Sequence, residues 1–161
     1  MSYKDFRKDL RSSMFNNVVM LTGKENFLVH WAVNQMKKKY GGKEFQAQNV
    51  REFDGAQVDI DEVIGMARTP SMFPGHRVLI VRNYPWLFQK KGKEELEEFR
   101  EGPGARLLEY AAGADHSEYA SMIIMTVDAQ YYKDSSPRNC GLTAYGKKLL
   151  QKSSGYEMNT L

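Results

Sequence analysis

The segment VVMLTGKENFLVHWAV, from Val18 to Val33, contains residue types that could bind a phosphate group. A short apolar run ends at Gly23 and Lys24, and apolar residues with helical spacing follow directly. A strand, a glycine turn and a helix N-terminus bind phosphate in many nucleotide-binding proteins, because the turn directs backbone N–H groups at the anion. The segment therefore has the outline of a nucleotide site.

The side chains that a phosphate loop needs are absent from this segment. The P-loop pattern requires a second glycine, a lysine and a serine or threonine at fixed distances from the first glycine. In the register that starts at Gly23, these positions hold Leu28, Val29 and His30. Leu28 adds bulk beside the phosphate, Val29 carries no charge, and His30 lacks the hydroxyl that binds magnesium. We interpret these residues, together with Lys24, as a degenerate P-loop that supports the fold and binds no nucleotide.

Other catalytic patterns are also missing. The strand expected over Arg77–Asn83 ends in Arg-Asn and not in the acidic residues that organise magnesium in ATPases. The dinucleotide-binding glycine pattern and the nucleophile elbow are both absent. The three histidines, His30, His76 and His116, do not have metal-ligand spacing. We therefore expect no catalytic residue, no metal and no cofactor.

Composition limits the remaining functions. The formal net charge of +3 is too small to indicate nucleic-acid binding without a focused basic patch. The one cysteine, Cys140, excludes an intramolecular disulfide and a multi-cysteine zinc site, and fits a reducing cytoplasm. Since the sequence has neither a secretory signal nor an apolar run long enough to cross a bilayer, we expect a cytoplasmic protein without a membrane partner.

Two other functions remain possible from the sequence. One is a small nucleotide-binding ATPase domain, which the outline of the P-loop would favour. The other is a basic nucleic-acid-binding module, which would use the two lysine clusters. The lysines of these clusters are Lys37, Lys38, Lys39 and Lys43, and then Lys147, Lys148 and Lys152.

The spacing of apolar residues predicts an α/β fold with five strands. We expect strands over 16–23, 48–55, 77–83 and 119–127, and a further strand or a linker over 155–161. Helices are expected over 3–14, from Asn26 to about 40, over 60–69 after Asp59 or Asp61, in two pieces over 91–113, and over 142–152. Because helices alternate with strands, the sheet should be parallel with right-handed crossovers.

Individual residues of these elements can also be assigned. The first helix should bury an apolar stripe of Tyr3, Phe6, Leu10 and Met14. Asn26 should cap the second helix, with Phe27, Trp31 and either Leu28 or Val33 on its apolar side.

Two features concern the later part of the chain. The polar segment 131–141 should be its least ordered part. The sequence also ends on an expected strand without a covering helix, so we expect residues 1–161 to be one domain of a longer protein.

Met72 and Phe73 stand side by side in the loop that follows the helix over 60–69. Adjacent residues in a loop that contains Pro70, Pro74 and a glycine cannot both follow one helical stripe. Either at least one of them is exposed as an interface anchor, or they seal the end of the sheet. The two prolines and the strand that begins at Arg77 would support such an anchor and reduce the ordering cost of binding.

Three segments together resemble the N-terminal domain of the delta subunit of the bacterial DNA polymerase III clamp loader. They are NNVVMLTGKENFLVHWAVNQMKKKY, NVREFDG and IDEVIGMARTPSMFPGHRVLIVRN. The resemblance is specific from Tyr3 to Asn83 and extends to Val127 in the order of elements. It implies an AAA+-like, three-layer P-loop NTPase fold with a degenerate nucleotide site. It also implies a non-catalytic subunit of a DNA-directed DNA polymerase, which is a nucleotidyltransferase holoenzyme.

The resemblance further implies that the domain engages the sliding clamp, the beta subunit, and helps to open the ring for loading on primed DNA. Met72 and Phe73 fall on the pair of apolar residues that enters a clamp pocket in this family. Lys24, where an acid is common, and Met72, in place of leucine or phenylalanine, are modest departures. Other clamp-loader subunits, and primer–template DNA indirectly, are implied as partners of the full-length protein. The family's helical and collar domains are absent, so we expect this fragment to be monomeric.

Overall fold

The computed structural model describes residues 1–114, 121–132 and 141–159. Its elements follow the order that the sequence predicts, with two additional short helices, α3 and η1. In chain order they are α1 (Tyr3–Ser12), β1 (Val18–Thr22), α2 (Asn26–Tyr40), α3 (Gln46–Asn49), β2 (Val50–Asp54), α4 (Ile60–Ala67), β3 (Val78–Arg82), η1 (Pro85–Leu87), α5 (Lys93–Glu101), α6 (Pro103–Ala112), β4 (Met122–Thr126), α7 (Ala144–Lys152) and β5 (Ser154–Glu157).

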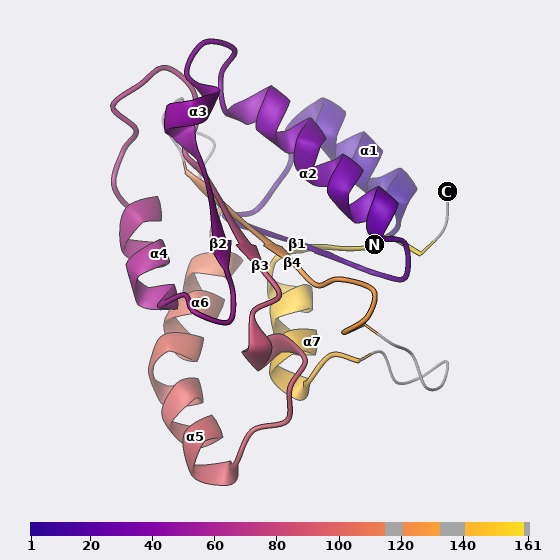
Figure 1. The fold of residues 1–161 in the computed structure, drawn as a ribbon, viewed down its shortest axis with the longest axis vertical. Coiled ribbons are helices and arrows are strands. Elements are labelled where there is room, and N and C mark those ends of the chain that lie inside the picture. The colour runs from indigo at the N-terminus through magenta and orange to yellow at the C-terminus, as the bar shows by residue number, and fades with distance from the viewer. Residues whose placement is uncertain (115–120, 133–140, 160–161) are drawn as a thin grey trace.

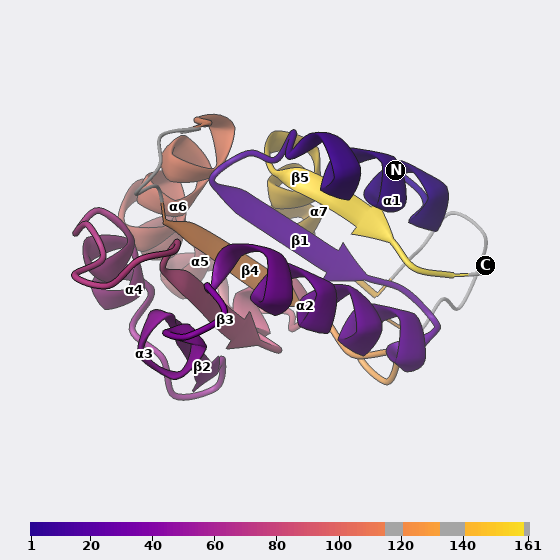
Figure 2. The same ribbon diagram turned by 90° about the horizontal axis from the view of Figure 1, so that it is seen from above.

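The five strands form one parallel sheet in the order β2-β3-β4-β1-β5, which confirms the predicted fold class. Helices α1 and α2 cover one face, and α4 to α7 lie on the other (Figure 1 and Figure 2). Within β1, Val18 and Met20 pack under α4 to α7, whereas Val19 and Leu21 pack under α1 and α2. Because both faces are covered, the central strands are continuous apolar runs and do not alternate with polar residues.

Helix α1 is shorter than the apolar stripe that we expected for it. Phe6 is fully buried and contacts the rings of Phe15, Trp31 and Tyr156. The helix ends at Ser12, and Ser13 adopts a left-handed conformation with φ of 55°. Met14 is consequently 63% exposed, so its assignment to the buried stripe was wrong.

Helix α2 corrects two further assignments. Glu25 is the N-cap residue, and the side-chain oxygen of Asn26 instead accepts the N–H of Ala129 at 2.7 Å. Phe27 is 75% exposed, whereas Leu28 and Val33 are both buried. The cap is set by where the helix begins, whereas Phe27 is exposed because α2 packs on the sheet through the face of Val29 and Val33, and Phe27 lies about 200° from Val29 at about 100° per residue.

The segment after α7 is strand β5 and not a linker. Its Tyr156 hydroxyl donates to a carboxylate oxygen of Asp9 at 2.6 Å, and the N–H of Glu157 donates to the Met1 carbonyl at 2.7 Å. These bonds connect β5 to the N-terminal helix. Most of segment 131–141, with Cys140, and also His116, lie outside the described residues.

Phe6 should anchor α1 to the sheet. Replacing it with alanine leaves a cavity among three rings, and we expect Phe6→Ala to lower the free energy of unfolding by about 3–5 kcal/mol. Met14→Ala is the control, because an exposed side chain should change that free energy by less than about 0.5 kcal/mol. Urea denaturation measures both. Equal effects of the two changes would contradict this account of α1.

Candidate protein-binding loop

The sequence-predicted site residues lie at the two ends of the strands. The loop with Met72 and Phe73 connects α4 to the start of β3, at the amino end of the sheet (Figure 1). The turn at Gly23 connects the end of β1 to α2, at the carboxyl end. In parallel α/β sheets ligands bind at the carboxyl end. The two sets of residues therefore form separate surfaces, and only the Gly23 turn is where such a fold holds a nucleotide.

The Met72 side chain projects into solvent. It is 90% exposed, and its neighbour Phe73 is 40% exposed. The Phe73 ring stacks on Phe45, with ring centroids 5.5 Å apart and an interplanar angle of 30°. Met72 thus does not seal the sheet, and Phe73 has one supported and one open side. We call Met72, Phe73 and Phe45 the apolar tip.

A buried amide holds the loop beneath the apolar tip. Asn49 is 1% exposed, and its Nδ2 donates to the carbonyl oxygens of Gly41 at 3.0 Å and Pro74 at 2.8 Å. Its Oδ1 accepts the Ser71 hydroxyl at 2.6 Å, and the Ser71 oxygen accepts the N–H of Phe73 at 3.1 Å. One side chain therefore connects the end of α2, the end of α3 and both sides of the loop.

Two glycines allow the backbone to approach Asn49 this closely. Gly75 has φ of 111°, and a Cβ atom there would lie 2.8 Å from Asn49 Nδ2. Gly42 has φ of 82°, and a Cβ atom there would lie 2.9 Å from the Pro74 carbonyl oxygen. Side chains rarely adopt such φ values and would also collide with the loop. The loop conformation is thus fixed by backbone packing as well as by Asn49.

The residues predicted to support the loop contribute unequally. Pro74 supplies a carbonyl to Asn49, and the Arg77 guanidinium donates to the Met66 carbonyl at 3.0 Å. Pro70 is exposed at the start of the loop. Asn49 and Phe45 were missed from the sequence, because the Asn49–Ser71 contact spans 22 residues and leaves no periodic pattern. The glycines at 41, 42 and 75 were the available signal of a close backbone approach.

The turn at Gly23 is occupied by the chain itself. Gly23 has φ of 134°, and a Cβ atom there would lie 2.5 Å from the carbonyl oxygen of Met158. That carbonyl accepts the N–H of Glu25 at 3.1 Å, and Asn159 Oδ1 accepts the N–H of Lys24 at 3.0 Å. The backbone donors that would face a phosphate are therefore bonded to the segment after β5.

The three residues at the P-loop positions, Leu28, Val29 and His30, contact other parts of the protein. Leu28 and Val29 are buried in the core between α2 and the sheet. The side chain of His30 is about half exposed, with Nε2 3.8 Å from Asp128 Oδ1. Asp128 and Asn83 bond reciprocally, each through a 2.8 Å contact. In the ranges that the structure describes, no group of three metal-ligating side chains occurs.

The first lysine cluster is partly engaged within the protein. Lys37 Nζ lies 2.5 Å from a Glu52 carboxylate oxygen, and Arg82 also pairs with Glu52. The hydrogen bond from Lys37, and less so that from Arg82, lowers the pKa of Glu52 below its usual value. Lys39 donates to the Leu10 carbonyl. The second cluster lies on α7 and is exposed.

Across the described part of the chain, no helix is long and apolar enough to cross a membrane.

Asn49 should be necessary for the loop conformation. We expect Asn49→Ala to lower the free energy of unfolding by about 1–3 kcal/mol, because the change removes a buried amide and leaves its partners unpaired. Gln48→Ala, an exposed neighbour in the same short helix, should have little effect. Urea denaturation compares the two variants. An Asn49→Ala protein as stable as Gln48→Ala would refute this role.

Comparison with known proteins agrees with the fold and with the motifs. A family model described as DNA polymerase III, delta subunit, matches residues 20–101, which is just over half of the chain. The structure of the Bacillus subtilis DNA clamp loader delta protein matches with a TM-score of 0.59 and 23% identity, over 98% of this chain and 42% of that chain. No curated protein sequence matches. At 23% identity the structural match shows a shared fold. On the family model, this chain belongs to the DNA polymerase III delta subunit family.

Proposed function

We propose that this domain binds the sliding clamp, the beta subunit, through Met72 and Phe73, and that binding helps to open the clamp ring for loading on primed DNA. The observation that carries the proposal is the Met72 side chain, 90% exposed beside Phe73 on a loop that Asn49 holds in place. Membership of the delta subunit family supports the choice of partner.

The apolar tip has the physical properties of an interface anchor. Burial of a methionine or phenylalanine side chain in a partner's pocket contributes roughly 1.5–3 kcal/mol. Few residues carry most of the energy of such interfaces, and they are large side chains in desolvated pockets. Because the loop is already ordered by Asn49 and Gly75, less conformational entropy is lost on binding. The Phe45 ring supports Phe73 from behind and leaves its other side open to the partner.

Ring opening would need no catalysis by this domain. A ligand shifts a conformational equilibrium by its differential affinity for the two states, so tighter binding to the opened clamp is sufficient. We propose that the domain neither binds nor hydrolyses ATP. The bonds from Lys24 and Glu25 to the segment after β5 support this part, because they use the donors that a phosphate would need.

We also propose that the full-length protein contacts other clamp-loader subunits and, indirectly, primer–template DNA. The chain spans 42% of the length of the Bacillus subtilis relative. Contacts with the other clamp-loader subunits, and indirectly with primer–template DNA, would need the segments of that relative that this chain does not cover.

The clamp-binding site can be tested by calorimetric titration with the cognate sliding clamp. We expect the double change Met72→Ala/Phe73→Ala to weaken binding by at least about 30-fold, because one lost anchor costs about 2 kcal/mol or more. Met72 is 90% exposed and Phe73 mainly loses its stacking on Phe45, so the free energy of unfolding should fall by only about 1–2 kcal/mol.

The matched control is Met14→Ala/Phe27→Ala. It removes the same two residue types from exposed positions on α2 and beyond the end of α1. We expect this control to bind the clamp as the unmodified protein does. Equal affinity of both double variants would refute the proposed site, and no binding by the unmodified protein would refute the partner.

The absence of nucleotide binding can be tested by thermal unfolding with ATP and magnesium. A ligand at one hundred times its dissociation constant stabilises a protein by about 2.7 kcal/mol, which raises the midpoint by several degrees. We expect no shift at millimolar ATP. A shift of several degrees would favour the nucleotide-binding alternative.

A further inference from the structure

A pocket of about 390 Å³ lies where α4 begins and where the chain leaves β3. Its lining residues follow β3 and precede α4, at the carboxyl end of the sheet. The loop between α4 and β3, which carries Met72 and Phe73, is at the amino end (Figure 1). Its size is within the range of ordinary ligand sites. A partner in this pocket would therefore leave Met72 and Phe73 accessible, and could bind whether or not the domain binds a clamp.

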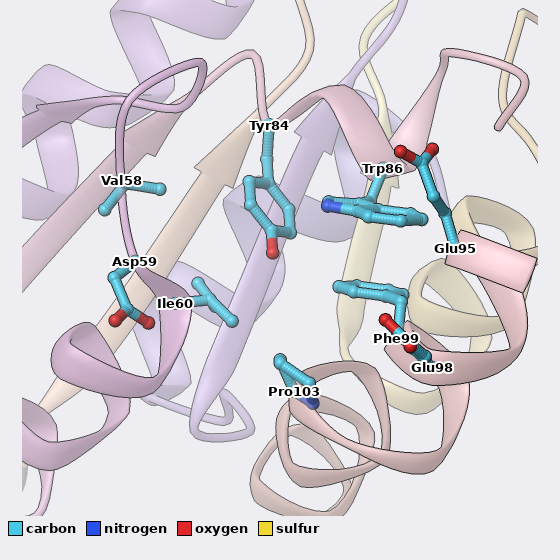
Figure 3. Close-up of a pocket in the computed structure, with 9 residues that line it drawn as sticks. All are labelled: Val58, Asp59, Ile60, Tyr84, Trp86, Glu95, Glu98, Phe99 and Pro103. Carbon is cyan, nitrogen blue, oxygen red and sulfur yellow. The ribbon is translucent and has the colours of Figure 1, made fainter.

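Aromatic and aliphatic side chains form the inner wall of the pocket. Trp86 and Phe99 stack face to face, with centroids 4.1 Å apart and an interplanar angle of 2°. Tyr84 faces their edges across the pocket, and Ile60 and Pro103 close the bottom (Figure 3). The stack and the tyrosine provide a narrow apolar slot that can hold an aliphatic chain.

Tyr84 directs its hydroxyl into this slot. The residue is 5% exposed, its hydroxyl points into the pocket, and among the described residues it makes no hydrogen bond (Figure 3). Burial, and then the nearby carboxylates of Asp61 and Asp59, raise the pKa of Tyr84, so the hydroxyl stays protonated. Because the hydroxyl faces the open pocket, a ligand can form a hydrogen bond to it in place of water.

Three carboxylates surround the mouth of the pocket: those of Asp59, Glu95 and Glu98. Within the described ranges, Glu95 and Glu98 form no ion pair, and Asp59 uses one oxygen to cap α4. Of the nearby cations, Arg106 pairs with Asp61 and Lys91 lies 5.1 Å from the Trp86 ring centroid. Neither lines the pocket, so its mouth is negatively charged.

We propose that this pocket binds an arginine side chain of a partner protein. The aliphatic stem of arginine matches the apolar slot, and its guanidinium group can reach the carboxylates at the mouth. The Tyr84 oxygen accepts one of the five guanidinium N–H groups, and the planar fork of donors can pair with carboxylates in two places, which a lysine ammonium does not do.

The Trp86 indole indicates that the arginine belongs to a peptide. Its N–H edge is directed toward Tyr84 (Figure 3), and in the described part of the chain it has no hydrogen-bond acceptor. A cation without an acceptor group could not bond to this donor. A backbone carbonyl next to the bound arginine can satisfy it, so the pocket suits an extended segment of a protein.

The indole N–H signal of Trp86 in a proton–nitrogen correlation spectrum is a direct probe of the pocket. The chain has two tryptophans, so a Trp31→Phe variant assigns the signals. The ligand is the capped tripeptide acetyl-Gly-Arg-Gly-amide, and its citrulline analogue is the neutral isostere. We expect the Trp86 signal to shift and saturate at roughly millimolar arginine peptide. The citrulline peptide should bind several-fold more weakly. Equal shifts with both peptides, or no saturation with either, would overturn the proposal.

Paired variants separate the pocket from general charge effects. Glu95→Gln/Glu98→Gln should weaken binding of the arginine peptide by about threefold to tenfold, as expected for two lost ion pairs. Glu94→Gln/Glu97→Gln removes the same charge from α5 at positions that do not line the pocket, and should leave binding unchanged. Equal weakening in both pairs would assign the effect to net charge and refute the site.

Tyr84→Phe tests the hydroxyl alone. The peptide should bind more weakly, while the thermal midpoint should not fall, because the hydroxyl has no partner to lose. Unchanged peptide affinity in Tyr84→Phe would exclude the hydrogen bond on which the choice of ligand rests.

Discussion

The hydrogen bonds of Asn49 are the constraint on which the candidate binding surface depends. A single buried amide joins the end of α2 to both sides of the loop between α4 and β3. These segments are distant in sequence and share no strand pairing. Because the loop lies outside the sheet, strand pairing does not fix its conformation, and Asn49 adds to the few backbone contacts that do. Asn49 connects the loop to the end of α2 through hydrogen bonds and so restricts its motion. The glycines at 42 and 75 permit the close backbone contact that these bonds require.

The opposite end of the sheet shows how a nucleotide-binding frame can become structural. A phosphate loop depends on backbone donors that are free to turn toward an anion. Here the segment after β5 accepts the donors of Lys24 and Glu25, and its backbone fills the space beside Gly23. Leu28 and Val29 then extend the core where phosphate-binding groups would stand. The turn is retained, and its hydrogen bonds connect β1 to β5.

Most of the fold could be predicted from the sequence, because long apolar runs and helical spacing reflect burial by the whole sheet. The five strands and their parallel arrangement are examples. Errors occurred at the start of α2: the cap is decided by local bonds such as the one from Ala129 to Asn26, and the exposure of Phe27 by which face of the helix packs on the sheet. The sequence left open whether Met72 and Phe73 are exposed or seal the sheet, and it gave no sign of Asn49 and Phe45, since their contacts are long-range and aperiodic.

Exposure of an apolar residue does not by itself identify a binding site, and this chain provides its own comparison. Phe27 is 75% exposed, more than Phe73 at 40%, yet it lies in the first turn of α2 without an aromatic neighbour in the described residues. Phe73 is stacked on Phe45 and its N–H is bonded to Ser71. Scattered exposed apolar residues are ordinary, whereas an ordered pair loses less entropy on binding. Met72 adds an adaptable side chain to this rigid base, so it can fit a pocket whose shape changes as a ring opens.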